Sequence, residues 1–499
     1  MNTLLHNLIY SCIIFNIMKN VIGRVKSISF TGFYSNIVNV EVQILKGLHS
    51  FSIVGMADKC IVESRDRIRS AFYSSGFDFP LSKIIVNLSP ARDHKEGTHY
   101  DLPIALAILA ATGELKTDIT NALCLGELSL GGEIITTVGG IQAIDLSFKE
   151  NLSLVSGTSY SNDFSLYPKR PESVYLAHNL RELVNYLNEN RQYGEFNYDI
   201  IDNNVVISEP FLHVHGQASA KRAMLISAAG KHHMSLVGAP GVGKTTLVNE
   251  MPKLLPDLTE QQAIEVTTIY SLASLLQNQK LIRRPPMRIP HSSASEVSLL
   301  GGIYPGECSL AHHGVLFLDE FPEFKCIDAL RVPIESKWVT ISRATKKIIY
   351  PCDFLLMAAM NPCKCGFLLE NKCVCGKKNY MNRVSAPVQD RIDIRIYLSK
   401  PKIDAKDTKF NYQSAVKVAR DLQITRQGCL NKDVDISYID THISTDTMSL
   451  IHNFALEKNL SMRSVNKIKR IARTIADLVQ SERIHNDHVY EALLLVNYV

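Results

Sequence analysis

The sequence predicts an α/β fold that is followed by an all-helical C-terminal segment, and three observations predict it. Residues 235–247 combine an apolar strand, a glycine-rich loop and the start of a helix. Two further apolar stretches, 314–320 and 354–361, end in polar residues, as strands of a parallel sheet do at a functional edge. From about residue 404 the pattern is helical almost throughout, most clearly over 461–482.

The composition is that of a globular protein, with 46% hydrophobic and 21% charged residues among 499. This length favours two to four domains. A net charge of +5 permits a nucleic-acid partner without indicating one. The 11 cysteines and the lack of a convincing export signal indicate a reducing, cytoplasmic compartment, with free thiols or a metal site rather than disulfides.

The N-terminal residues 4–18 are mostly apolar but lack the basic start and the cleavage site of a signal peptide. They are also shorter than the roughly 18–20 residues of a membrane span. They form either a loosely packed extension or a stretch upstream of the true start at Met18, and the sequence favours the second. No other stretch approaches the length of a span, so we expect a soluble protein without membrane association.

The front of the chain mixes strands and helices. Glycines end both helices, and a glycine-rich hairpin is expected over 123–141, whereas residues 149–200 are polar and have no assigned role. The expected strands are 38–45, 51–56 and 83–90, and the expected helices are 63–76 and 102–113. We therefore predict an extension (1–21), a front α/β domain (22–195), a linker (196–212), a core (213–402, with an insert at 363–375) and a helical domain (403–499).

Residues 238–245 match G-x-x-x-x-G-K-T, with a strand before them and a helix after them, the setting that a phosphate-binding P-loop requires. The glycines let backbone N–H groups turn toward an anion. Lys244 is expected at the β- and γ-phosphates, and Thr245 at Mg²⁺. The predicted nucleotide-binding residues are Gly238, Ala239, Pro240, Gly241, Val242, Gly243, Lys244, Thr245 and Thr246.

Acidic and amide side chains follow the next two apolar stretches. We predict that Asp319 binds the metal and that Glu320 acts as the general base on water. Asn361 is expected to orient that water, although an Asn before a proline also serves as a simple turn residue.

These motifs, in this order, closely resemble those of the ComM/YifB group of magnesium-chelatase-like AAA+ ATPases. The resemblance covers roughly 22–495 and is carried by the runs GAPGVGKT, GVLFLDEFPEF, AAMNPCKCG, QDRIDI, SMRSVNKIKRIARTIADL, ESRDRIRSAF, NLSPA, KEGTHYDLPIALAILAA and GELSLGGEI. It implies ATP and Mg²⁺ as ligands and an AAA+ core with a C-terminal helical lid. It also implies that Arg391 is an arginine finger for a neighbouring subunit and that Arg463 is the second sensor arginine, so that the active form is a ring, most simply a hexamer.

Four cysteines lie within 13 residues, directly after Asn361. Their spacing, C-x-C-x7-C-x-C, suits a tetrahedral structural Zn²⁺, although reduced thiols without metal are the alternative. The predicted ligands are Cys363, Cys365, Cys373 and Cys375.

Residues 338–351 alternate as a hairpin does, with Arg343, Lys346 and Lys347 at its tip. Taken alone, these cations are better explained by an ordinary solvated turn. In the resembling family a hairpin at this place faces the pore of the ring, which implies a contact with DNA phosphates.

Residues 22–190 resemble the proteolytic domain of Lon-type proteases but lack its catalytic dyad. The stretch that corresponds to the serine motif, 95–101, has no serine, and Gly139-Gly140 are followed by Ile141 and Gln142 rather than lysine. We therefore expect a binding or assembly platform rather than a protease.

The resemblance implies an ATP-driven motor on single-stranded or branched DNA, with branch migration in recombination and natural transformation as its task. The alternative is a protein-remodelling ATPase like that of magnesium chelatase. A regulatory protease is disfavoured by the missing serine and lysine.

Overall fold

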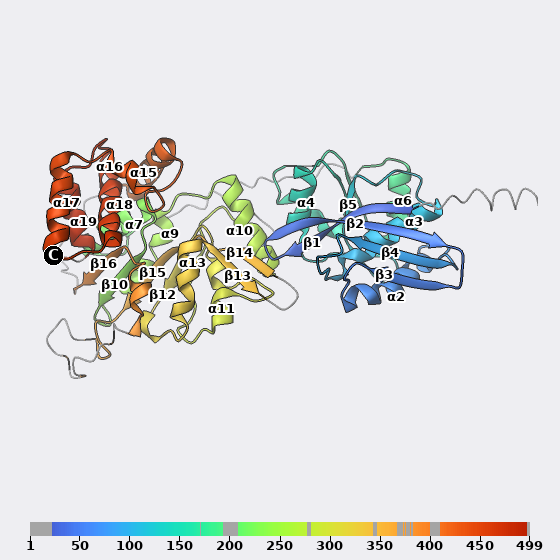
Figure 1. The fold of residues 1–499 in the computed structure, drawn as a ribbon, viewed down its shortest axis with the longest axis horizontal. Helices are drawn as coiled ribbons and strands as arrows, with labels where there is room; N and C mark the ends of the chain where they lie inside the picture. The colour runs from blue at the N-terminus through green and yellow to red at the C-terminus, as the bar shows by residue number, and fades with distance from the viewer. Residues whose placement is uncertain are drawn as a thin grey trace, which may run out of the picture. The chain divides into compact units, whose positions relative to one another are not determined.

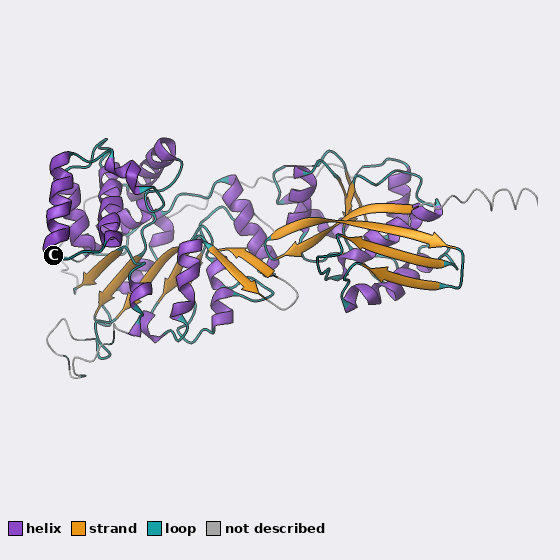
Figure 2. Cartoon of the chain, viewed as in Figure 1, coloured by secondary structure: helices purple, strands orange, loops and turns teal. Residues whose placement is uncertain are grey.

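The computed structural model describes residues 22–169, 171–192, 208–276, 281–342, 347–366, 373, 375, 380, 383–399 and 410–496. The chain divides into two compact units, 1–201 with 267–281 and 342–349, and the remainder (Figure 1). Both contain sheet and helix, and the second ends in helices alone (Figure 2), so the predicted α/β class is confirmed. The predicted extension 1–21 and linker residues 196–207 lie outside the described residues.

The first unit is built on a seven-stranded sheet with the order β3-β4-β2-β1-β5-β8-β9. Its two longest strands pair antiparallel, from the partners Ile22 and Gln43 at one end to the partners Thr31 and Tyr34 at the other. Alternate side chains of the second strand (Val38, Val40, Val42) are buried, which fits one covered face. The strands are β1 (Ile22–Thr31), β2 (Tyr34–Leu45), β3 (Ser50–Val54), β4 (Lys83–Ser89), β5 (Ala122–Cys124), β8 (Ser153–Gly157) and β9 (Val174–Ala177).

Helices of the first unit start and end where local chemistry predicts. Asp58 caps α2 (Lys59–Ser74) by accepting a 2.9 Å bond from the backbone N of Ile61. The apolar helix α3 (Asp101–Thr112) ends at Gly113, whose φ is 82°. The predicted hairpin 123–141 is only partly right, because β6 (Glu127–Leu128) pairs with β7 (Ile134–Ile135) and the chain then enters α4 (Gly140–Lys149).

The polar stretch 149–200 is largely structured. Besides β8 and β9 it forms α5 (Ser161–Ser165) and α6 (Leu180–Asn188). Helix α6 buries Leu180, Leu183 and Leu187 at helical spacing, which gives the first unit part of its core.

The second unit contains a five-stranded sheet with the order β11-β12-β15-β10-β16, and all its strand pairs are parallel. Every residue of its three central strands is buried, which explains their continuous apolar runs. Because the strands are parallel, Gly238, Asp319 and Asn361 follow strand ends at the same edge of the sheet. The strands are β11 (Met287–Arg288), β12 (Val315–Leu318), β15 (Leu355–Met360), β10 (Met234–Gly238) and β16 (Ile394–Leu398).

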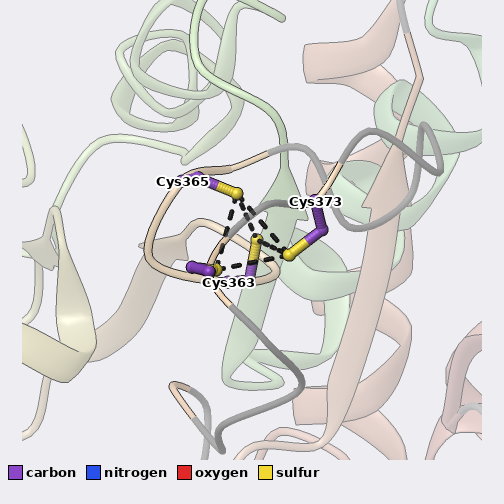
Figure 3. Close-up of side chains that lie close together, drawn as sticks. Cys363, Cys365 and Cys373 are labelled. Atoms are coloured by element: carbon purple, nitrogen blue, oxygen red, sulfur yellow. Dashed lines mark hydrogen bonds between the residues drawn. The ribbon is translucent and has the colours of Figure 1, made fainter.

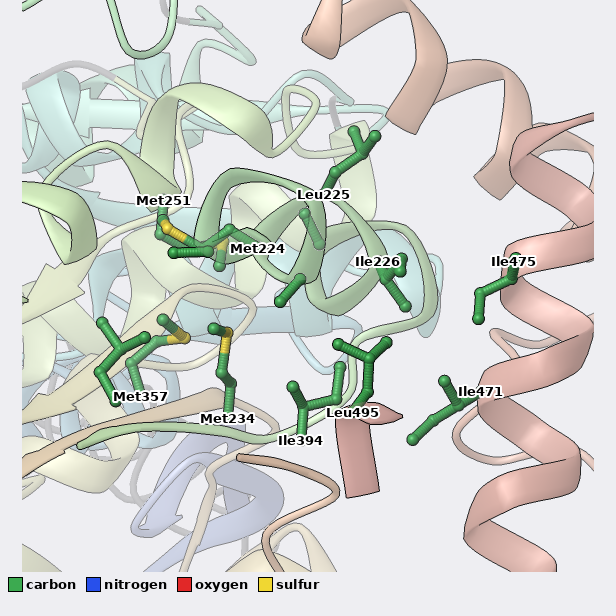
Figure 4. Close-up of a cluster of buried hydrophobic side chains, with 14 of the residues drawn as sticks. Met224, Leu225, Ile226, Met234, Met251, Met357, Ile394, Ile471, Ile475 and Leu495 are labelled. Atoms are coloured by element: carbon green, nitrogen blue, oxygen red, sulfur yellow. The ribbon is translucent and has the colours of Figure 1, made fainter. Parts of the chain in front are cut away.

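The C-terminal helices share one hydrophobic core with this sheet. Ile471 and Ile475 of α18 belong to the same buried cluster as Ile226 of α7 and Ile394 of β16 (Figure 4). The helices are α7 (Ala218–Gly230), α15 (Tyr412–Gln427), α16 (Ile436–Asp440), α17 (Thr445–Glu457), α18 (Met462–Leu478) and α19 (Asn486–Val496).

The remaining elements lie between β10 and β16. They include a separate two-stranded sheet of β13 (Trp338–Ser342) and β14 (Lys347–Pro351). The helices are α8 (Lys244–Val248), α9 (Met251–Leu254), α10 (Glu260–Leu272), α11 (Glu296–Leu300), α12 (Glu307–Leu310), α13 (Arg331–Ser336) and α14 (Ala386–Gln389). Among the described helices, none is both long enough and apolar enough for a membrane span.

Candidate nucleotide site

The P-loop connects the end of β10 to the start of α8. Gly241 and Gly243 have φ values of 78° and 90°, which side-chain-bearing residues rarely adopt, so glycine is required at both. Lys244 folds back over the loop, and its Nζ donates to the carbonyl oxygens of Gly238 (2.8 Å) and Ala239 (3.0 Å). The strand, loop and helix therefore take the order that the motif predicts.

The residues predicted to hold Mg²⁺ are in direct contact. Thr245 Oγ1 donates a 2.9 Å hydrogen bond to Asp319 Oδ2, which joins α8 to the end of β12. Glu320, the next residue, has a φ of 53°, and its backbone N donates to Asp319 Oδ1 at 2.9 Å. A hydroxyl and a carboxylate are hard oxygen ligands that suit Mg²⁺, so these two residues fit the ion.

The third predicted polar residue meets the same loop. Lys244 Nζ donates to Asn361 Oδ1 at 3.0 Å, which joins the P-loop to the end of β15. Burial lowers the pKa of Lys244, and the nearby Asp319 carboxylate opposes that shift. The structure thus brings Lys244, Thr245, Asp319, Glu320 and Asn361 together at one edge of the sheet.

The two predicted arginines form a second cluster. Arg391 Nη2 and Arg463 Nη2 both contact Glu335 Oε1, at 2.5 and 3.0 Å, and Arg463 Nη1 contacts Asp390 Oδ2 at 2.6 Å. The arginine guanidinium groups, Arg391 first, lower the pKa of Glu335. Arg391 Nε is buried and has no hydrogen-bond partner within the described part of the chain.

This arginine cluster lies at the opposite edge of the sheet from the P-loop. Arg391 comes shortly before β16, and the backbone N atoms of Asp393 and Ile394 both donate to His233 O, just before β10. From there β10 and β16 run in parallel to the pair Gly238–Leu398, where the P-loop begins. A cavity of about 370 Å³ adjoins the cluster, lined by Glu335, Arg391, Arg463 and further charged residues. Sequence patterns gave no signal for Glu335, because its role depends on contacts across the fold.

The four cysteines form one cluster, of which Figure 3 labels Cys363, Cys365 and Cys373. Neighbouring Sγ atoms lie 3.3 Å apart in Cys363–Cys365 and in Cys373–Cys375, and 3.5–3.6 Å apart between the two pairs. Zn–S bonds of about 2.3 Å place the sulfurs of a tetrahedral site about 3.8 Å apart, so the cluster fits Zn²⁺ after small adjustments.

A second group with metal-ligand chemistry is Glu265, His312 and His313. The backbone N of Asp353 donates to His312 Nδ1 at 3.0 Å, so in the neutral ring the proton lies on Nε2, which faces Glu265 Oε2 at 3.3 Å. This arrangement presents an N–H rather than a lone pair toward the carboxylate. It is therefore a hydrogen-bonded network rather than a prepared metal site.

Of the three cations predicted at the hairpin, the structure describes one. Lys347 begins β14 and is exposed, whereas Arg343 and Lys346 lie outside the described residues.

The stretch 95–101 of the first unit, which corresponds to the serine motif of Lon-type proteases, makes internal contacts. Lys95 is buried and donates to Pro90 O, and Asp101 pairs with Arg67 at 2.6 Å. Ile141 and Gln142, which follow Gly139-Gly140, lie inside α4 and are buried.

Comparison with known proteins places the chain in a family. Models for the magnesium chelatase subunit ChlI match residues 210–406 and 40–155, and a model of its C-terminal part matches 407–495. The uncharacterized protein YifB of Escherichia coli is 36% identical over 91% of this chain and 93% of its own length. The competence protein ComM of Haemophilus influenzae is 36% identical over 93% and 95%. With its parallel-sheet core and helical C-terminus, the chain belongs to the magnesium-chelatase-like family of AAA+ ATPases that includes ComM and YifB.

Proposed function

We propose that this chain is a ring-forming ATPase that couples ATP hydrolysis to movement on DNA. The observation that carries the proposal is the separation of two sets of side chains across one sheet. The P-loop cluster contains the phosphate-binding loop and the pair of proposed Mg²⁺ ligands, Thr245 and Asp319. The arginine cluster contains two guanidinium groups but no phosphate-binding loop. Each set is one half of an ATP-hydrolysing site.

The chemistry of the first half follows from its geometry. Lys244 would contact the β- and γ-phosphates, and Thr245 and Asp319 would hold Mg²⁺, which would neutralise charge on the phosphate oxygens. Asn361 orients the attacking water, and the Glu320 carboxylate accepts its proton. ATP and Mg²⁺ are therefore the ligands of this edge of the sheet.

The second half acts on another copy of the chain. Because Arg391 and Arg463 lie at the opposite sheet edge, they cannot reach the γ-phosphate held by their own P-loop without a large rearrangement. A head-to-tail neighbour brings the arginine edge of one copy to the phosphate edge of the next, where guanidinium groups stabilise the transferred charge. Repetition of that contact closes a ring, and we propose a hexamer.

DNA is the proposed substrate of the motor. The hairpin β13–β14 carries Lys347 at its exposed end, and Arg343 and Lys346 precede it in the sequence. Three cations lie within residues 343–347 of the sequence, and such a group would neutralise phosphates without reading bases. The name of the Haemophilus relative, a competence protein, supports a role in natural transformation. We propose a cytoplasmic location and branch migration of incoming DNA as the specific activity.

A protein-remodelling ATPase is the second candidate. The family models that match this chain carry the name of a magnesium chelatase subunit, which supports an ATPase of that type as the alternative to a DNA motor. The first unit, with its predicted Lon-like fold and without the protease dyad, serves as a binding platform in either case.

We also assign the four cysteines to a structural Zn²⁺, because all four ligands come from the chain.

A strand-displacement assay on forked DNA tests the motor. The wild-type chain with ATP is expected to release the displaced strand, and Lys244→Ala is expected to release none. Replacement of Arg343, Lys346 and Lys347 by Ala is expected to weaken DNA binding and to lower the log–log salt slope of binding by roughly 2, since each phosphate contact contributes about 0.7.

The matched control removes three exposed cations of the same types from the helical segment, Lys417, Lys458 and Arg483. This variant is expected to bind and unwind DNA as the wild type does. Equal losses in both triple variants would contradict a specific hairpin contact, and ATP-dependent activity on a protein partner alone would favour the remodelling ATPase.

A further inference from the structure

We infer that the four-cysteine cluster is a zinc site that holds the P-loop in its binding conformation, so that nucleotide binding depends on zinc. The inference rests on the proposed role of residues 238–245 as the ATP site and is independent of DNA. A single short segment, 361–366, contacts the P-loop at two points and also carries two of the four thiols.

The first contact is between glycine and proline. Gly366 has a φ of 86°, and a Cβ at this position would lie 2.3 Å from Pro240 Cδ and 2.8 Å from Pro240 Cγ. Its backbone N donates to Cys363 O at 3.0 Å, which fixes it to the cysteine turn. The backbone of that turn therefore lies directly against the P-loop.

The second contact is polar. Asn361 Oδ1 accepts the 3.0 Å hydrogen bond from Lys244 Nζ, and Asn361 lies two residues before Cys363. Cys363 is only 4% exposed. Any movement of the buried Cys363 turn is therefore transmitted to both the lysine and the proline of the phosphate-binding loop.

The P-loop has little packing of its own on the side of its glycines. Among the described residues, no heavy atom lies within 4 Å of a Cβ atom added at Gly241 or Gly243. The contact of Gly366 with Pro240 and the hydrogen bond from Lys244 to Asn361 therefore restrict the conformation of the P-loop. A metal supplies the rigidity, because four thiolate bonds link the 363–365 and 373–375 arms into one closed unit.

Zinc and ATP must then stabilise each other's binding, because the coupling free energy between two sites is reciprocal. Removal of zinc frees the cysteine turn and weakens ATP binding. Bound ATP, in turn, raises the affinity of the cluster for zinc, so that a chelator removes less zinc at equilibrium. No redox step is needed for this linkage.

Two variants separate the metal from the contact that it supports. Cys373→Ser removes a ligand, whereas Gly366→Ala keeps all four thiols but drives a methyl group into Pro240. The controls are Cys60→Ser, an exposed cysteine of the first unit, and Gly113→Ala, which has a φ of 82° with open space around its Cβ position. Proteins are purified with reductant and zinc, and folding is checked by the fluorescence of Trp338, the only tryptophan.

Zinc per chain is measured by elemental analysis, and affinity is measured with a fluorescent ATP analogue and Mg²⁺ in the absence of DNA. We expect about one zinc in the wild type, in Gly366→Ala and in both controls, and none in Cys373→Ser. Affinity is expected to fall about tenfold or more in Cys373→Ser and Gly366→Ala and to stay at the wild-type value in the controls.

A wild-type chain without zinc overturns the metal site. Wild-type affinity in folded Cys373→Ser and Gly366→Ala overturns the coupling. If zinc-loaded wild type does not bind the analogue, the proposed ATP site itself is wrong, and the inference falls with it. Absence of an effect of DNA on hydrolysis refutes only the DNA motor.

Discussion

Lys244 Nζ and Asn361 Oδ1 are joined by a 3.0 Å hydrogen bond that connects the P-loop on β10 to the end of the neighbouring strand β15. The amide is thus held where the γ-phosphate of bound ATP and its attacking water are expected. This contact places the Asn361 amide, the proposed water-orienting group, beside the lysine of the P-loop.

Asn361→Ala is expected to lower kcat for ATP hydrolysis on the order of 10²-fold and to change ATP affinity much less. The reason is that an orienting group acts mainly in the transition state. Steady-state hydrolysis and equilibrium binding, measured side by side, check this. Asn453→Ala, an exposed position of α17, serves as the control. A variant with wild-type kcat would show that Asn361 is only a turn residue.

Glu320→Gln is expected to bind ATP with near wild-type affinity and to turn over roughly 10²–10⁴-fold more slowly, because an amide cannot accept the proton of water. Glu457→Gln, an exposed carboxylate at the end of α17, should behave as the wild type. Rapid turnover by Glu320→Gln would refute its role as the general base.

Mixing inactive variants tests whether the site is shared between copies. Lys244→Ala and Arg391→Ala should each be inactive alone. A mixture should regain activity, because some contacts between copies combine an intact P-loop with an intact Arg391. The control is a mixture of Lys244→Ala with the double variant Lys244→Ala/Arg391→Ala. Because every chain in this mixture has a disabled P-loop, no contact between copies can combine an intact P-loop with an intact Arg391. A mixture that stays inactive although the chains co-assemble would contradict the shared site.

Protonation of buried histidines should destabilise the second unit at acidic pH. Burial lowers the pKa of both His232 and His312 to about 4, from an ordinary value of 6.5. The unfolded chain therefore binds protons below pH 6.5 that the folded chain binds only near pH 4, so stability is lost as pH falls through this window. A 2.5-unit difference corresponds to about 3 kcal/mol for one fully buried histidine.

Urea midpoints followed by Trp338 fluorescence should thus fall between pH 7 and pH 5. His232→Asn should flatten part of that decline, although it also loses the 2.7 Å contact with Thr474 Oγ1. His452→Asn, at an exposed position of α17, should leave the slope unchanged. An unchanged slope in His232→Asn would show that this histidine does not set the pH dependence.

Local patterns in the sequence were sufficient for most elements that position the P-loop. The expected strands 51–56, 83–90 and 354–361 correspond to β3, β4 and β15, and the expected helix 102–113 corresponds to α3. Each has a strong apolar period and a glycine, proline or polar residue at its end. The sequence motifs assigned both Thr245 and Asp319 to Mg²⁺, and the two side chains are hydrogen-bonded in the structure.

Features that depend on tertiary contacts were beyond the sequence. The stretch 149–200 looked polar, yet β8 and β9 are strands of the first sheet with nearly every residue buried, and α6 buries apolar residues at helical spacing. Glu335 gave no local signal, because its partners Arg391 and Arg463 are 56 and 128 residues away. The approach of Gly366 to Pro240 likewise depends on how two loops meet.

Steady-state ATP hydrolysis by the wild-type chain, with and without single-stranded or branched DNA at two salt concentrations, tests the motor on DNA most directly. The account predicts Mg²⁺-dependent hydrolysis that DNA stimulates, with the stimulation falling as salt rises because phosphate contacts release counterions. Robust hydrolysis that neither DNA alters at either salt concentration would contradict it and favour a protein substrate.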